Sequence, residues 1–190
     1  MSKLYQLLQQ DAVILENSIV KVDSFLNHQM NIELFEEIRD QFYEYFKDKK
    51  IDKIITCEAS GIGIAIMVAQ AFRVNVVFAK KDESQILTNN CYTAPVFSYT
   101  KNKESVIKID KRFIQANENI LIIDDFLANG EAVAGLINIV QQAHAHVRGI
   151  GIVIEKGFQQ GGQRLREKGF DLYSLAIIDA IIENQLIMRV

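Results

Sequence analysis

Short apolar runs alternate along the chain with segments in which apolar residues have helical spacing. Between residues 32 and 46, apolar side chains recur every three or four positions, which predicts an amphipathic helix. Other runs are short, aliphatic and rich in β-branched residues, which is typical of buried strands. The expected helices cover residues 3–10, 32–46, 64–72, 130–143 and 164–168. The expected strands cover residues 13–15, 19–22, 53–57, 75–79, 120–123, 147–154 and 172–178.

This order of elements predicts an α/β fold, a mostly parallel sheet flanked by helices on both faces. Ligands in such sheets bind beyond the carboxyl ends of the strands. The candidate loops are those at Glu58, Lys80, Asp124 and Glu155. Residues 80–111 differ, because polar and apolar positions alternate there, as in 94–99 and 105–109. They predict an exposed antiparallel hairpin with a polar turn at residues 101–104.

The pattern favours one continuous domain over residues 1–190, with a small N-terminal piece and a polar interruption at residues 27–29. The chain has 190 residues, 49% of them hydrophobic, and a single proline, so no proline-rich linker divides it. The N-terminus lacks the apolar stretch of a signal peptide. No apolar run approaches the ~20 residues that cross a bilayer. We therefore expect a cytoplasmic protein with no membrane partner.

Charge and cysteine content narrow the class of protein further. A net charge of -3 and a pI of 5.7 argue against a nucleic-acid binder, which usually has a basic excess. Cys57 and Cys91 do not make a disulfide framework. Because Cys57 ends an apolar run, we interpret it as a small buried hydrophobe and not as a nucleophile. The three histidines form no metal set, and His144 and His146 are expected on the surface at a helix end.

The strongest chemical signal is the stretch ILIIDDFLANGEA at residues 120–132. Four aliphatic residues predict a buried strand, and Asp124 and Asp125 follow at its carboxyl end. A turn then leads into a helix whose first backbone N–H groups can bind an anion. Gly130 permits positive φ and close approach of a ligand. The paired acids can accept hydrogen bonds from vicinal hydroxyls, so this stretch predicts a site for a sugar phosphate.

A structural alternative exists, since Asn129 or Asp125 would also serve as an ordinary helix cap. Other phosphate-binding motifs fit the chain less well. No Gly-Lys-Ser/Thr is present, so this is not a P-loop. A Gly-x-Gly follows the strand at 53–57, but Ile66 stands where a dinucleotide fingerprint requires its third glycine.

The stretch at residues 120–132 resembles the signature of the type I phosphoribosyltransferases, which bind phosphoribosyl pyrophosphate (PRPP). Two further segments, residues 21–29 and 149–156, are similar to the branch of this family that uses xanthine in purine salvage. The likeness extends over most of the chain. It implies transfer of the 5-phosphoribosyl group from PRPP to N9 of xanthine, with pyrophosphate as leaving group. It also implies a homodimer, and Mg²⁺ bound mainly through PRPP without direct side-chain ligation.

The resemblance assigns PRPP-binding roles to three groups of residues. The acids beside the ribose hydroxyls, the expected catalytic residues, are Asp124 and Asp125. The loop that holds the 5-phosphate comprises Ala128, Asn129, Gly130, Glu131 and Ala132. Many relatives have threonine at the position of Asn129, so backbone amides must do more here. The turn that meets pyrophosphate comprises Glu58, Ala59 and Ser60. In the family this turn often contains a cis peptide bond that does not precede proline.

Further cations and a base-binding group also follow from the resemblance. Lys80 and Lys81 open a hairpin, residues 80–111, that the family uses as a mobile lid over pyrophosphate, and Lys103 is a third candidate cation there. Lys156 matches the lysine that meets the 6-oxo group of the purine. Val20 and Asn27 belong to an N-terminal hood, residues 1–30, that covers the base, and the Asn27 amide offers both a donor and an acceptor.

Several structural readings stay open beside these roles. Ser60 would serve as a plain helix cap, and each lysine would serve as a solvated charge. Phe158 fits base stacking or core packing. A guanine- or hypoxanthine-preferring transferase also fits Lys156, because a lysine at that position accepts any 6-oxopurine. A non-catalytic regulator that senses PRPP or purines is less favoured, since such proteins normally carry a separate DNA-binding domain.

Overall fold

A computed structural model describes residues 2–15, 19–82, 90–98 and 103–189 of the chain. Within these residues, eight strands form one mixed sheet in the order β10-β9-β8-β7-β3-β4-β6-β5. The strands are β3 (Lys53–Cys57), β4 (Asn75–Asp82), β5 (Cys91–Ser98), β6 (Lys103–Asp110), β7 (Asn119–Leu127), β8 (His146–Lys156), β9 (Leu172–Ile182) and β10 (Gln185–Met188). The mixed α/β fold predicted from the pattern is confirmed.

The centre of the sheet is parallel and its two sides are antiparallel. Strands β4, β3, β7, β8 and β9 run parallel, whereas β10, β6 and β5 pair antiparallel with their neighbours. Strand β4 changes partner along its length. Its first five residues pair with β3, and Lys80 and Lys81 pair with β6. The carboxyl ends of the parallel strands therefore meet along one edge, next to the base of the β5–β6 hairpin.

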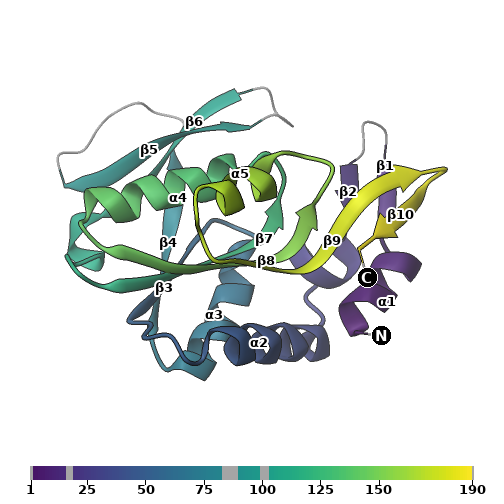
Figure 1. Cartoon of the computed structure of the whole chain (residues 1–190), viewed down its shortest axis with the longest axis horizontal. Coiled ribbons are helices and arrows are strands. Elements are labelled where there is room, and N and C mark those ends of the chain that lie inside the picture. The colour runs from purple at the N-terminus through teal and green to yellow at the C-terminus, as the bar shows by residue number, and fades with distance from the viewer. Residues whose placement is uncertain (1, 16–18, 83–89, 99–102, 190) are drawn as a thin grey trace.

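Helices cover both faces of this sheet, as the pattern predicted (Figure 1). Helices α4 (Glu131–Gln142) and α5 (Gly161–Glu167) lie on one face, and α2 (Ile32–Phe46) and α3 (Gly61–Phe72) lie on the other. The alternation of side chains along β7 serves both layers. Ile120 and Ile122 belong to the core cluster with α4, whereas Leu121 and Ile123 belong to the cluster with α2 and α3. Complete burial of each such side chain stabilises the fold by about 1.5–3 kcal/mol.

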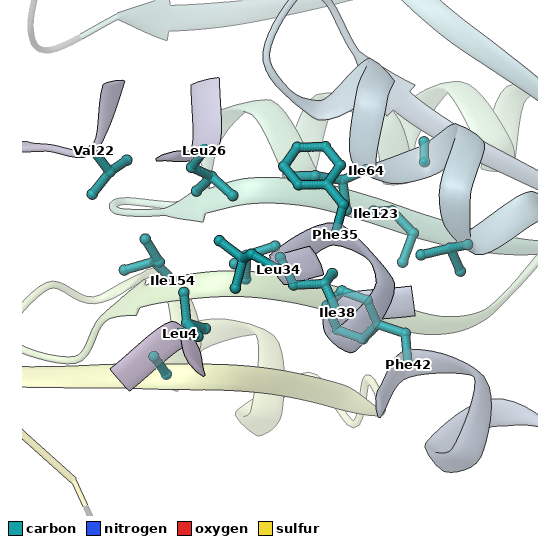
Figure 2. Close-up of a cluster of buried hydrophobic side chains, with 14 of the residues drawn as sticks. Leu4, Val22, Leu26, Leu34, Phe35, Ile38, Phe42, Ile64, Ile123 and Ile154 are labelled. Atoms are coloured by element: carbon teal, nitrogen blue, oxygen red, sulfur yellow. The ribbon is translucent and has the colours of Figure 1, made fainter. Parts of the chain in front are cut away.

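Helix α2 supplies much of one core layer through its apolar stripe. Leu34, Phe35, Ile38 and Phe42 are buried and point toward the sheet (Figure 2). The helix begins after Asn31, whose side chain accepts a hydrogen bond from the Leu34 N–H at 3.0 Å. This N-cap satisfies one of the amide groups that a helix start leaves without a partner.

The N-terminal segment lies beside β9 and β10 (Figure 1), and its buried side chains, such as Leu4 and Leu26, belong to the same core cluster as those of α2 and α3. It comprises α1 (Lys3–Gln10), strands β1 (Val13–Leu15) and β2 (Ile19–Lys21), and a π-helix at Asp23–Asn27 that periodicity did not predict. The two ends of the described chain lie together, because the Tyr5 hydroxyl donates a hydrogen bond to the carbonyl oxygen of Arg189. None of the helices in the described ranges is both long and apolar enough to span a membrane.

Three expectations about the elements need correction. The strand expected at residues 120–123 extends to Leu127, so the paired acids lie inside β7 and not in the turn after it. Strand β10 was not predicted, because its four residues lack a clear period. The β5–β6 hairpin is not exposed on both faces. Its apolar face, Ala94, Val96, Ile107 and Ile109, is buried in the core cluster that contains α4.

Candidate active site

The paired acids of β7 are both buried at the carboxyl edge of the sheet. Asp124 and Asp125 expose 6% and 7% of their surfaces. The N–H of Asp125 donates to Oδ1 of Asp124 at 3.1 Å. From the N-terminal segment, Nδ2 of Asn27 approaches Oδ2 of Asp125 at 3.5 Å. The structure thus brings three predicted site residues together from segments about a hundred positions apart in sequence.

Burial gives this acid pair an unusual electrostatic state. Burial, and next the neighbouring charge of Asp125, raise the pKa of Asp124 well above its ordinary value, while the more distant charge of Lys81 opposes the shift. Two adjacent buried carboxylates repel each other, because little water remains to screen them. Hydroxyl donors from a ligand would relieve this repulsion, so the pair is suited to grip vicinal hydroxyls.

The turn between β7 and α4 leaves backbone amides available for an anion. Gly130 is the N-cap of α4, has a positive φ of 88°, and no side chain caps the helix. The interpretation of Asn129 or Asp125 as the cap is therefore wrong. Glu131 and Ala132 form the first turn of the helix, where N–H groups have no intrahelical acceptor. Together with the helix dipole, these amides make a site for a phosphate.

Helix α5 packs against this turn through Gly161, a residue that the sequence analysis did not assign to the site. The Gly161 N–H donates to the Ala128 carbonyl at 3.1 Å. A Cβ on Gly161 would lie 2.3 Å from that carbonyl oxygen and 2.8 Å from the Gly130 nitrogen. Only glycine allows such an approach, so any larger residue would displace the turn. The sequence contains the Gly161–Gly162 pair, but it gives no sign that Gly161 contacts the turn at Ala128.

The turn after β3 lies at the same edge. The peptide bond between Glu58 and Ala59 is cis. The Glu58 N–H donates to the Ala79 carbonyl at 3.1 Å, and its Oε1 accepts from the Lys81 N–H at 2.6 Å. Ser60 precedes α3 but makes no side-chain cap, so that alternative is also wrong. The turn is thereby held against β4, where Lys81 sits.

Lys80 and Lys81 lie within β4 and are exposed. Lys81 is close enough to act electrostatically on both Asp124 and Cys57. The side chain of Lys103 lies outside the described residues, as do residues 101 and 102 of the predicted polar turn.

Lys156 is the last residue of β8 and is half-buried. Burial lowers the pKa of its ammonium group, and its Nζ lies 6.0 Å from the centre of the Phe126 ring. The interpretation as a fully solvated lysine is therefore wrong.

Two other predicted contacts with the base differ in burial. Val20 is buried in β2, so it can contribute only backbone contacts and packing. Phe158 is 39% exposed, which excludes core packing.

The residue before Lys156 forms a buried ionic network that sequence reasoning did not identify. Glu155 is 3% exposed, and its two carboxylate oxygens accept bidentate hydrogen bonds from Arg166 of α5, both at 2.7 Å. Ser174 of β9 also donates to it at 2.5 Å. Burial alone would raise the pKa of Glu155, but these hydrogen bonds outweigh it and lower that pKa. The network fixes α5 and β9 to the end of β8.

In the part of the chain that the structure describes, the cysteine and histidine side chains show no arrangement that indicates a catalytic role. Cys57 is buried, and burial raises the pKa of its thiol to about 11, which confirms the interpretation as an inert small hydrophobe. His144 and His146 are exposed, as expected.

A surface cavity of about 690 Å³ lies at the opposite edge of the sheet, lined by Lys49, Arg148 and Asp171 among others. Its charged groups already bond within the protein, since Lys49 pairs with Asp171 and Arg148 donates to Asn119.

A magnesium ion bound through a substrate fits this edge. Within the described ranges, no three or more His, Cys, Asp or Glu side chains form a group that could hold a metal. Asp124 and Asp125 offer only adjacent carboxylates. Mg²⁺ commonly retains water and takes further oxygen ligands from substrate phosphates, so a complete protein cage is not needed.

Solved structures of adenine phosphoribosyltransferases share this fold. The Trypanosoma brucei enzyme in complex with AMP, pyrophosphate and ribose-5-phosphate has a TM-score of 0.76 at 17% identity, over 93% of this chain and 79% of that one. The Saccharomyces cerevisiae enzyme, with an imino-altritol bisphosphate and adenine, has a TM-score of 0.73 at 24% identity, over 90% and 95%. The chain thus has the fold of these phosphoribosyltransferases.

Proteins with similar sequences identify the family to which the chain belongs. Xanthine phosphoribosyltransferase of Ruminiclostridium cellulolyticum is 52% identical over 186 residues, 98% of both chains. Xanthine phosphoribosyltransferase of Finegoldia magna is 48% identical over 189 residues, 100% of both chains. No protein-family model matches the sequence. The chain belongs to the xanthine phosphoribosyltransferase family, a family of pentosyl-transferring enzymes, and the resemblance drawn from the motifs is confirmed.

Proposed function

We propose that this protein transfers the 5-phosphoribosyl group of PRPP to N9 of xanthine, forming xanthosine 5′-monophosphate and pyrophosphate in purine salvage. One observation carries the proposal. The buried acids Asp124 and Asp125, the uncapped amide turn at Gly130 and the half-buried Lys156 lie at one edge of the sheet. The names of the relatives, which cover the whole chain, support the choice of xanthine.

The proposed PRPP site has two parts on one strand–turn–helix unit. The 5-phosphate accepts hydrogen bonds from the amides of residues 128–132, as at other helix starts that bind phosphate. Asp124 and Asp125 accept hydrogen bonds from the 2- and 3-hydroxyls of the ribose. Because the amide turn follows the acids directly, the sugar and its phosphate are oriented together, which lowers the entropic cost of reaching the transition state.

The leaving group is proposed to lie against the turn formed by Glu58, Ala59 and Ser60. Lys80 and Lys81 extend from the adjoining part of β4 and would stabilise the charge that develops on pyrophosphate. When bound, Mg²⁺ would neutralise charge on the diphosphate, with most of its ligands from substrate and water.

The base is proposed to lie between Lys156 and the N-terminal segment. Lys156 donates a hydrogen bond to the 6-oxo group and disfavours the 6-amino group of adenine, which is itself a donor. Asn27 would contact both base and ribose, a role supported by the approach of its amide to Asp125. Val20 contributes packing and backbone contacts. Residues 1–30 would form a hood over the base, and Phe158 is exposed for stacking.

The reaction needs orientation and charge stabilisation more than a covalent nucleophile. Departure of pyrophosphate breaks the bond between C1 of the ribose and oxygen and leaves an oxocarbenium-like carbon, as in other glycosyl transfers. N9 then forms the new bond to C1, and the imidazole proton of xanthine passes to the released pyrophosphate. Water must be excluded, because hydrolysis of PRPP competes with transfer. We propose that residues 80–111 act as the lid that excludes water. The face of its hairpin that packs on α4 would anchor the lid.

The proposed function is tested by measuring pyrophosphate release with xanthine, guanine, hypoxanthine and adenine side by side. We expect the highest kcat/KM for xanthine and negligible turnover of adenine. Replacing both Asp124 and Asp125 by alanine, in protein whose circular dichroism is unchanged, should abolish PRPP affinity. A preference for guanine or hypoxanthine would assign the runner-up activity. Binding of PRPP without turnover of any purine would instead indicate a regulator, and a preference for adenine would contradict the role of Lys156.

We also propose that the protein forms a homodimer, as the family resemblance implies. The apolar face of the β5–β6 hairpin is not available for association, because it packs on α4. Exposed apolar side chains lie instead on the N-terminal hairpin, namely Val13, Leu15 and Ile19.

A further inference from the structure

One buried hydroxyl group stands out beside the acid pair. Thr56, the fourth residue of β3, has 0% of its surface exposed. Among the described residues, its Oγ1 is one of two buried side-chain oxygen or nitrogen atoms with no hydrogen-bond partner. A buried hydroxyl without a partner is destabilising, and most such groups in folded proteins are paired. The ligand-free fold therefore gives no structural reason for threonine in preference to valine at this position.

A glycine brings this hydroxyl next to the first catalytic acid. A Cβ built on Gly61 would lie 2.1 Å from Thr56 Oγ1 and 3.1 Å from Asp124 Oδ1. Both oxygens therefore border the small space that the absent side chain leaves at the start of α3. Any larger residue at position 61 would separate them or displace them. Oδ1 of Asp124 accepts a hydrogen bond from the Asp125 N–H at 3.1 Å.

We infer that Thr56 is a positioning residue, whose hydroxyl donates a hydrogen bond to the Asp124 carboxylate when that carboxylate turns to receive the ribose. This inference rests on the proposed function. The hydroxyl is fully buried, so it acts through Asp124 and does not touch substrate. A donor to the ionised form favours charge on a carboxylate that burial and a like neighbour disfavour. Hydrogen bonds to charged groups are also stronger than neutral ones.

The test compares Thr56→Val, which keeps the shape and removes the donor, with Thr56→Ser, which keeps the donor. We expect Thr56→Val to raise the KM for PRPP about tenfold, with a smaller change in kcat and an unchanged KM for xanthine. Thr56→Ser should stay within about twofold of the wild type. Thr56→Val should also unfold at a temperature equal to or above that of the wild type.

Each other outcome overturns the inference. An unchanged KM for PRPP in Thr56→Val would show that the hydroxyl plays no part in the site. Loss of stability or failure to fold in Thr56→Val would show a structural hydroxyl, and Thr56→Ser no better than Thr56→Val would show that the donor is irrelevant. These results are distinct from failure of the proposed function, in which the wild-type protein itself would not consume PRPP with any purine.

Discussion

At the residue scale, the candidate site contains two carboxyl groups, Asp124 and Asp125, that are buried away from water. Asp124 is buried next to Asp125, and burial followed by that neighbour raises its pKa. A carboxyl group whose pKa is higher in the folded than in the unfolded protein stabilises the fold most below its unfolded pKa. That contribution is lost as the pH rises toward the folded pKa. At neutral pH the buried Asp124 thus opposes folding, which is a common cost of a functional site.

Asp124→Asn is therefore expected to raise the thermal unfolding midpoint at pH 7 by a few degrees while it abolishes PRPP binding. The amide is uncharged, so neither its burial nor its contact with Asp125 carries the penalty of the carboxylate. The gain should shrink as the pH is lowered, because protonated Asp124 is then also neutral. Differential scanning calorimetry between pH 4 and pH 8 measures both effects.

Asp48→Asn is the control for that measurement, because Asp48 is exposed beyond the end of α2. It should leave the midpoint unchanged within a degree or so. A lower midpoint for Asp124→Asn than for the wild type at pH 7 would contradict the assignment of Asp124 as a destabilising buried charge.

At the scale of elements, α5 connects the two proposed substrate subsites. Gly161 packs on the turn that would hold the 5-phosphate, and Arg166 pairs with Glu155, the neighbour of the base lysine. Gly162 lies directly against that carboxylate, since a Cβ there would be 1.9 Å from Glu155 Oε1. The helix is only seven residues long, too short to be stable alone. Its position therefore depends on these contacts.

Arg166→Met is expected to lower the free energy of unfolding by about 2–3 kcal/mol at pH 7, because Glu155 would remain buried without its partner. This loss is smaller than the about 3–5 kcal/mol typical of a fully buried pair, because the Arg166 side chain is partly exposed. The pKa of Glu155 is lowered in the fold, so the stability it contributes is present above its unfolded value of 4.5 and is lost as the pH falls below that. Urea denaturation should show the wild type and the variant converging at acid pH.

Two comparisons sharpen this prediction. Arg164→Met removes a neighbouring, exposed arginine of the same helix and should cost less than about 1 kcal/mol. Glu155→Gln combined with Arg166→Met should recover part of the loss, because the unpaired charge is gone. Equal losses for Arg164→Met and Arg166→Met would contradict a specific role for the ion pair.

At the scale of the whole molecule, the sheet assembles a site that no single segment contains. The paired acids come from β7, and the lysine proposed to bind the base comes from β8. The turn proposed to bind pyrophosphate follows β3, and Lys80 and Lys81 belong to β4. The N-terminal segment adds Asn27 from a short π-helix. Parallel strands meet at one edge, and this shared edge is the reason that the residues converge.

Sedimentation equilibrium should give twice the chain mass of 21.6 kDa, as the proposed homodimer requires. The exposed apolar residues of the N-terminal hairpin make association there favourable, because it removes apolar surface from water. Val13→Asp is expected to weaken that association, whereas Lys50→Asp, on an exposed position elsewhere, is not. A single species at the mass of one chain at all concentrations would contradict the dimer.

The sequence by itself determined the local units of this protein. Helical spacing at residues 32–46, the aliphatic run before Asp124 and the glycine after Asn129 each depend on a few neighbouring positions, so their elements and the phosphate turn could be predicted. The family followed from the same motifs.

Tertiary structure alone decided which of these units touch. Three contacts join positions that no local pattern connects. They are Asn27 with Asp125, Gly161 with Ala128, and Thr56 with the space next to Gly61. The burial of Glu155 with Arg166 and of the hairpin face under α4 arises in the same way. Periodicity reports which side of an element is apolar, but the choice of partner depends on how all the elements pack together.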